Sequence, residues 1–117
     1  LASVLLKVKK FYPMVNSAIN VKFDALLEQL MQKSGWNIYY LESDSAKSDM
    51  IPDLIEEMFS TKGTKGKEPD AIVHRGSVGL EAATYIFGRS VNELLNKVLD
   101  LSALYYSRQK KNEDMLT

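Results

Sequence analysis

The residues best suited to chemistry gather in one short segment, residues 74–81, where a histidine, an arginine and a serine stand among glycines. An apolar run, residues 71–73, precedes this segment, and a second apolar run, residues 82–87, follows it. A strand that leads into a glycine-containing turn is a common way for α/β proteins to build a site for an anion. The segment is therefore the first candidate for a binding site.

The backbone of this turn supports one specific hypothesis. The N–H groups of Gly76, Ser77 and Gly79 could converge on a phosphate, with Arg75 as a bidentate charged partner. The Ser77 hydroxyl would be a further donor. The alternative is a β-hairpin turn in which the glycines only supply positive φ angles. The residue pattern alone leaves both interpretations open.

Three other residues are candidates for binding. His74 is the only histidine of the chain and could act as a general acid or base, although a histidine at the end of a strand also serves purely structural roles. Asn20 and Lys22 alternate along a predicted strand, residues 16–23, and so share one face of it. Asn20 would hydrogen-bond a heterocycle or hydroxyl, and Lys22 would contact phosphate. The alternative is an ordinary solvated strand face.

The overall composition argues against several classes of protein. The 117 residues suit one domain, and 15 basic side chains balance 15 acidic ones. Because nucleic-acid binders usually carry a basic excess, we expect no direct nucleic-acid binding by this segment. The chain has no cysteine and one histidine, so we expect no metal site and no cofactor. No apolar run approaches the roughly 18 residues of a membrane span, and we expect a cytoplasmic protein without a membrane partner.

Hydrophobic periodicity and capping residues predict four helices and four strands. The first helix should end at Tyr12, and the others should begin at Asp24, Asp49 and Ser90 as N-caps. Beyond the strand at residues 16–23, strands are expected at residues 36–41, 70–74 and 82–87. The last helix should bury one face, formed by Val91, Leu94, Leu95, Val98 and Leu99.

This order predicts the fold class. Alternating helices and strands indicate an α/β protein, a layered α/β/α sandwich with a mixed sheet and helices on both faces. The last two strands should pair antiparallel. We expect a single domain over residues 1–107 and a flexible tail over residues 108–117.

Two segments resemble a known family. Residues 12–23, YPMVNSAINVKF, are similar to the pattern "peiRSAMNIRY", and residues 69–81, PDAIVHRGSVGLE, to "PDVIYDRGGVGKE". Residues 87–90, which lead into the last helix, resemble the family's "LGKD". These patterns belong to the archaeal-type thiamine-phosphate synthase (ThiN) domain, which follows a hydroxymethylpyrimidine phosphate kinase or a helix-turn-helix domain. The resemblance spans residues 2–101 and implies a fragment that lacks its N-terminal part.

The resemblance implies a function. The family joins hydroxymethylpyrimidine diphosphate to hydroxyethylthiazole phosphate, giving thiamine phosphate and pyrophosphate. Arg75, the backbone from Gly76 to Gly79, and Lys22 would then hold phosphorylated substrates and stabilise the leaving pyrophosphate. Asn20 and Glu81 match the family's asparagine and glutamate, and His74 occupies the position of a family aspartate.

The departures from the family imply an alternative. Asn16 and Lys22 stand where the pattern has arginines, and Leu80 stands where it has a lysine. Lysine keeps the charge but lacks the bidentate fork of arginine. Loss of cations would weaken catalysis, so the alternative is a non-catalytic domain that senses its ligand for a thiamine-responsive transcription regulator. In either case the expected partner is a phosphorylated small molecule, with a homodimer as an open alternative.

Overall fold

The computed structural model describes residues 1–42, 50–62, 66–77 and 81–116. Helices and strands follow in the predicted order α-β-α-β-α-β-β-α. Their bounds are α1 (Ala2–Phe11), β1 (Ser17–Lys22), α2 (Ala25–Lys33), β2 (Ile38–Leu41), α3 (Ile51–Lys62), β3 (Ala71–His74), β4 (Ala83–Gly88) and α4 (Val91–Leu116).

The strands form one mixed sheet in the order β1-β4-β3-β2. β4 lies antiparallel to both of its neighbours, and β2 lies parallel to β3. The parallel pair is joined through α3, which is the usual connection between parallel strands. The mixed sheet and the antiparallel pairing of the last two strands confirm the prediction.

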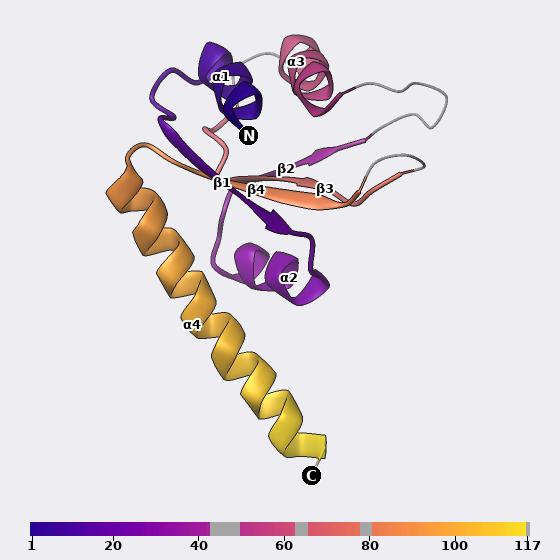
Figure 1. Ribbon diagram of the computed structural model, residues 1–117, viewed down its shortest axis with the longest axis vertical. Helices are drawn as coiled ribbons and strands as arrows, with labels where there is room; N and C mark the ends of the chain where they lie inside the picture. The colour runs from indigo at the N-terminus through magenta and orange to yellow at the C-terminus, as the bar shows by residue number, and fades with distance from the viewer. Residues whose placement is uncertain (43–49, 63–65, 78–80, 117) are drawn as a thin grey trace.

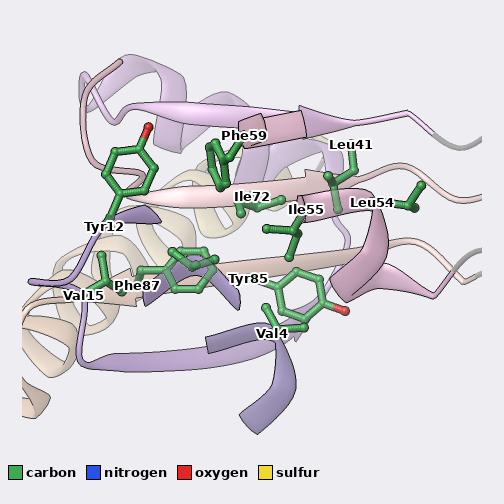
Figure 2. Close-up of a cluster of buried hydrophobic side chains, with 11 residues drawn as sticks. Val4, Tyr12, Val15, Leu41, Leu54, Ile55, Phe59, Ile72, Tyr85 and Phe87 are labelled. Atoms are coloured by element: carbon green, nitrogen blue, oxygen red, sulfur yellow. The ribbon is translucent and has the colours of Figure 1, made fainter. Parts of the chain in front are cut away.

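Helices cover both faces of this sheet, which confirms the layered α/β/α architecture. α1 and α3 lie on one face, and α2 and α4 lie on the other (Figure 1). Phe59 of α3 lies at the centre of the first layer, with ring centroids of Phe11, Tyr12 and Tyr39 5.1 to 5.6 Å away. Figure 2 shows this layer of buried side chains, which includes Val4, Val15, Leu41, Leu54, Ile55, Ile72, Tyr85 and Phe87.

The second layer joins the sheet to α2 and α4. Its buried members are Leu30, Met31, Ala71, Val73, Ile86, Leu94 and Leu101. Because β3 has a neighbour on each side and helices on both faces, all four of its residues are buried. This burial explains why β3 is a continuous apolar run up to His74.

The ends of the helices follow from local chemistry. The Asp24 carboxylate accepts hydrogen bonds from the N–H groups of Leu26 and Leu27 at 2.8 and 3.1 Å, which confirms it as the N-cap of α2. Gly35 follows that helix with a φ of +78°, a conformation that favours glycine. The Ser90 hydroxyl accepts from the N–H of Glu93 at 3.1 Å. Asp49, the predicted cap of α3, lies outside the described residues.

The buried face of α4 differs from the prediction. Leu94 and Leu101 are buried, but Val91, Leu95 and Leu99 are 52 to 64% exposed. The face of α4 that packs in the second layer consists instead of residues 94, 98, 101 and 105, because α4 crosses the sheet and only this row meets it. The helix also continues to Leu116 through the segment predicted as a tail. Within the described residues, no helix combines the length and apolar content needed to cross a membrane.

A nearly buried lysine attaches α4 to the sheet. The Lys97 ammonium lies 2.7 Å from Asp70 Oδ1 and 2.6 Å from the Phe87 carbonyl oxygen. It also lies 5.0 Å from the centroid of the Trp36 ring. The other oxygen of Asp70 accepts from the Asn37 N–H at 2.8 Å. This single cation therefore links α4 with the starts of β2 and β3 and the end of β4.

A second polar contact joins α4 to α2. The Tyr105 hydroxyl donates to Asp24 Oδ2 at 2.6 Å. This hydrogen bond is the main reason that the pKa of Asp24 lies below its ordinary value, and the N–H groups of Leu26 and Leu27 lower it further. The ionised carboxylate thus holds the start of α2 and the middle of α4 together.

Removal of the Tyr105 hydroxyl should weaken this contact in a pH-dependent way. An aspartate whose pKa is lowered by folding stabilises the fold above its unfolded pKa of about 4, and this stabilisation is lost as the pH falls through the folded pKa. Tyr105→Phe should therefore lower the free energy of unfolding at neutral pH, and the loss should shrink below pH about 4. Urea denaturation of both proteins between neutral pH and pH about 3 measures this difference. Tyr106→Phe, at a 65% exposed neighbour, is the control and should change little.

Gly88 lies where β4 meets the start of α4, with no room for a side chain. A Cβ atom there would lie 2.9 Å from both the Leu94 nitrogen and Ser17 Oγ. Gly88→Ala should lower the free energy of unfolding by about 1–3 kcal/mol, the usual cost of overpacking. The exposed Ser3→Ala should stay within about 0.5 kcal/mol in the same denaturation experiment. An equal decrease in the free energy of unfolding of the two variants would contradict the close packing around Gly88.

Candidate functional site

A cavity of about 580 Å³ lies against β1 and β4. It contains three of the predicted site residues, Asn20, Lys22 and Glu81, together with Tyr85. Its other lining residues are Val21, Phe23, Ala82 and Ala83. A volume of this size is typical of sites for small molecules.

The antiparallel register of β1 and β4 explains why these residues meet. Asn20 is directly opposite Tyr85, and Lys22 is directly opposite Ala83. Directly opposed residues project on the same face of a sheet, with Cβ atoms about 5 Å apart. Glu81 lies two residues before β4 begins, at the same end of the sheet. One strand pair therefore places an amide, an ammonium, a carboxylate and a phenol around one cavity.

The polar groups of this cavity are available for a ligand. Asn20, Lys22, Glu81 and Tyr85 make no side-chain hydrogen bond or ion pair with any other residue that the structure describes. Lys22 supplies a positive charge, and Asn20 supplies both a donor and an acceptor. The arrangement can therefore hold an anion beside a polar ring.

Tyr85 is the member of this site that the sequence analysis missed. Its side chain is only 7% exposed, and burial raises the pKa of its hydroxyl above the ordinary value. The hydroxyl therefore stays protonated and can donate at neutral pH. In the sequence, Tyr85 reads as part of an apolar strand. The only signal is its position opposite Asn20, which requires the pairing register.

The predicted glycine turn borders a different cavity, of about 240 Å³. His74, Arg75 and Gly76 line it, with Tyr40, Leu41, Glu42 and Val73. The two cavities lie at the same end of the sheet, because Ala83 pairs with Lys22 on one side and with His74 on the other. Two strand spacings, about 10 Å, separate Lys22 from His74 along this row.

Arg75 is engaged by neighbouring side chains. Its Nη2 lies 2.6 Å from Glu28 Oε2, and its guanidinium lies 4.8 Å from the Tyr40 ring centroid. Glu28 belongs to α2, and Tyr40 packs in the α2–α4 layer. Asn20 and Tyr85 instead face the layer of α1 and α3. The structure therefore places Arg75 on the other face of the sheet from Asn20, although its side chain is 61% exposed.

His74 is buried at the end of β3 and contacts the backbone of the glycine turn. The His74 side chain is 1% exposed, and its Nδ1 accepts from the Gly76 N–H at 3.3 Å. Gly76 has a φ of +92°, as the turn hypothesis expects. Its N–H points to the imidazole, so the predicted convergence of backbone donors on an anion is not formed by this group. Ser77 is half-buried, and Gly79 and Leu80 lie outside the described residues.

Asn16, at the position of a family arginine, has a structural role. Its side-chain amide donates to the carbonyl oxygens of Met14 and Arg89 at 3.0 and 3.2 Å. Its side-chain oxygen accepts from Lys9. These bonds hold the loop before β1 against the loop after β4. Among the described residues, no group of three or more histidine, aspartate or glutamate side chains could hold a metal ion.

Comparisons with known proteins agree with the sequence patterns. The family model described as thiamine-phosphate synthase ThiN matches residues 1–100. The chain is 26% identical over 108 residues to a bifunctional thiamine biosynthesis protein, ThiDN, of Methanocaldococcus jannaschii. The match covers 90% of this chain and 25% of that protein, so the chain spans about a quarter of its curated relative.

Two solved structures have a similar fold. The C-terminal domain of a phosphomethylpyrimidine kinase is 26% identical, with a TM-score of 0.67 over 86% of this chain and 59% of that one. The C-terminal domain of protein MJ0236 is 25% identical, with a TM-score of 0.71 over 91% of this chain and 57% of that one.

The contact between Arg75 and Glu28 can be tested by a double-mutant cycle. Glu28 is 8% exposed and Arg75 is its charged partner. We expect Arg75→Ala, Glu28→Gln and the double variant to give a coupling free energy of about 1 kcal/mol, limited by the solvent around Arg75. Chemical denaturation of the four proteins measures it. A coupling indistinguishable from zero would show that Arg75 is free for another partner.

Proposed function

This chain belongs to the thiamine-phosphate synthase ThiN family, and from this premise we propose that it binds a phosphorylated intermediate of thiamine biosynthesis. The ligand is thiamine phosphate or one of its pyrimidine and thiazole phosphate precursors. The site is the cavity that lies against β1 and β4, where Lys22 contacts the phosphate. The nominal activity is that of a thiamine-phosphate synthase.

One observation carries the proposal. Asn20, Lys22 and Glu81 come from two motifs about 60 residues apart in the chain, and they line one cavity with their polar groups unengaged by other described residues. An ammonium at the cavity suits a phosphate, and a neutral amide suits a heterocycle.

The reaction of the family requires a site that aligns two substrates and stabilises a leaving group. In the synthase reaction the thiazole nitrogen attacks the methylene carbon attached to the pyrimidine. A C–N bond forms, the C–O bond to the diphosphate breaks, and pyrophosphate leaves with the electron pair. The protein has to align two bound substrates and stabilise the departing negative charge. Lys22 is the proposed electrostatic partner of that leaving group.

A non-catalytic ligand sensor is the second candidate function. It is favoured by Asn16, which stands where the family pattern has an arginine and whose amide group is committed to backbone carbonyls. Asn16 itself does not line the cavity, and within the lining Lys22 supplies an ammonium where the pattern has an arginine guanidinium. A site with fewer cations can still bind a monophosphate, but it stabilises a leaving pyrophosphate less well.

Binding measurements test the proposed ligand class. Titration calorimetry should show that the protein binds thiamine phosphate more tightly than unphosphorylated thiamine, because only the phosphate meets Lys22. Lys22→Gln should weaken thiamine phosphate binding about tenfold, the scale of one charge-assisted hydrogen bond at a solvated site. It should leave the affinity for thiamine unchanged.

A matched control and one assay complete this test. Lys33→Gln removes a charge from the last turn of α2, outside the cavity, and should not alter binding. Absence of binding at millimolar thiamine phosphate and its precursors would overturn the proposed function. Turnover of hydroxymethylpyrimidine diphosphate and hydroxyethylthiazole phosphate would decide for the synthase, and binding without turnover would decide for the sensor.

A further inference from the structure

We propose that Tyr85 is a specificity-determining residue of the β1–β4 cavity, where its hydroxyl and the Asn20 amide together recognise an aminopyrimidine edge. The inference rests on the proposed function, which supplies the class of ligand, and it adds which part of the ligand this cavity recognises. Lys22 holds the phosphate, and Tyr85 with Asn20 selects the ring.

Tyr85 combines a buried ring with a hydroxyl that has no hydrogen-bond partner among the described residues. The residue is 7% exposed, and it lines the cavity. No residue that the structure describes forms a hydrogen bond with its hydroxyl. Unlike the Tyr12 hydroxyl, the Tyr85 hydroxyl is not enclosed, so a ligand in the cavity can reach it. Figure 2 shows the ring packed in the α1–α3 layer, with its oxygen directed away from Phe87 and Phe59.

The position of Asn20 defines what the pair can recognise. It is directly opposite Tyr85 across the β1–β4 ladder, so the two polar groups can reach one planar ligand edge. Asn20 Oδ1 can accept a hydrogen bond, and the Tyr85 hydroxyl can donate one. Burial raises the pKa of Tyr85 and keeps this donor protonated.

An aminopyrimidine edge is the complement of this pair. Its exocyclic amino group donates to Asn20 Oδ1, and the ring nitrogen beside that group accepts from the Tyr85 hydroxyl. Asparagine recognises the amino and ring nitrogens of adenine by the same donor–acceptor logic. The pyrimidine of thiamine carries an amino group beside a ring nitrogen, whereas the thiazole phosphate has no such edge. A site that hydrogen-bonds a ligand group discriminates strongly against analogues that lack it.

The test measures the affinities of three probes for the full chain and for Tyr85→Phe. The probes are hydroxymethylpyrimidine phosphate, thiamine phosphate and hydroxyethylthiazole phosphate. Tyr85→Phe keeps the buried ring and removes only the hydroxyl. It should weaken the two pyrimidine-containing ligands about tenfold and leave hydroxyethylthiazole phosphate unchanged. Asn20→Ser should have the same selective effect and provides a second variant at an exposed position.

Tyr12→Phe is the matched control. Tyr12 is also a buried tyrosine of the α1–α3 layer, and it does not line the cavity. This variant should leave all three affinities unchanged. Equal affinity of Tyr85→Phe and the unmodified protein for thiamine phosphate would overturn the inference while the proposed function stands. Equal weakening of all three probes would overturn the assignment to the ring. If the unmodified protein binds no probe, the proposed function itself fails.

Discussion

Lys97 holds α4 against the sheet at the starts of β2 and β3 and the end of β4. Its side chain is 15% exposed, and an ammonium so far removed from water must recover its lost hydration from protein groups. Asp70, the Phe87 carbonyl and the Trp36 ring provide this compensation, and Asp70 also accepts from the backbone of Asn37. Two further contacts hold α4 on this face of the sheet: the row of residues 94, 98, 101 and 105 packs in the second layer, and the Tyr105 hydroxyl donates to Asp24.

Strand register and side-chain alternation determine the composition of the candidate site. The β1–β4 ladder brings Asn20 against Tyr85, and the same alternation turns Arg75 toward Glu28 on α2. Two cations that appear equivalent in the sequence, Lys22 and Arg75, thus acquire different surroundings. One is free of ion pairs with other described residues and borders the larger cavity, and the other neutralises a buried carboxylate. The glycine turn contributes a second, smaller cavity at the same end of the sheet.

Much of the fold could be predicted because its signals are local. The Asp24 cap and the apolar run of β3 each depend on a few neighbouring residues. The predicted stripe of α4 was wrong at Val91, Leu95 and Leu99, because which row is buried depends on how the helix crosses the sheet. Asn20, Lys22 and Glu81 could be named as candidates because their signals are local. Tyr85 and the pairing of Arg75 with Glu28 could not be predicted. Those two features depend on contacts between elements.

The strand that carries half of the candidate site is an edge strand. In the described sheet β1 pairs only with β4, so detaching it breaks one ladder, whereas β3 and β4 each have two. Edge elements open locally at lower free energy than central ones. A ligand that contacts Asn20 and Lys22 on one strand and Tyr85 on the other lies across that ladder. Its binding free energy then adds to the cost of detaching β1. Slower amide hydrogen exchange in β1 would therefore report directly on whether a ligand occupies the cavity.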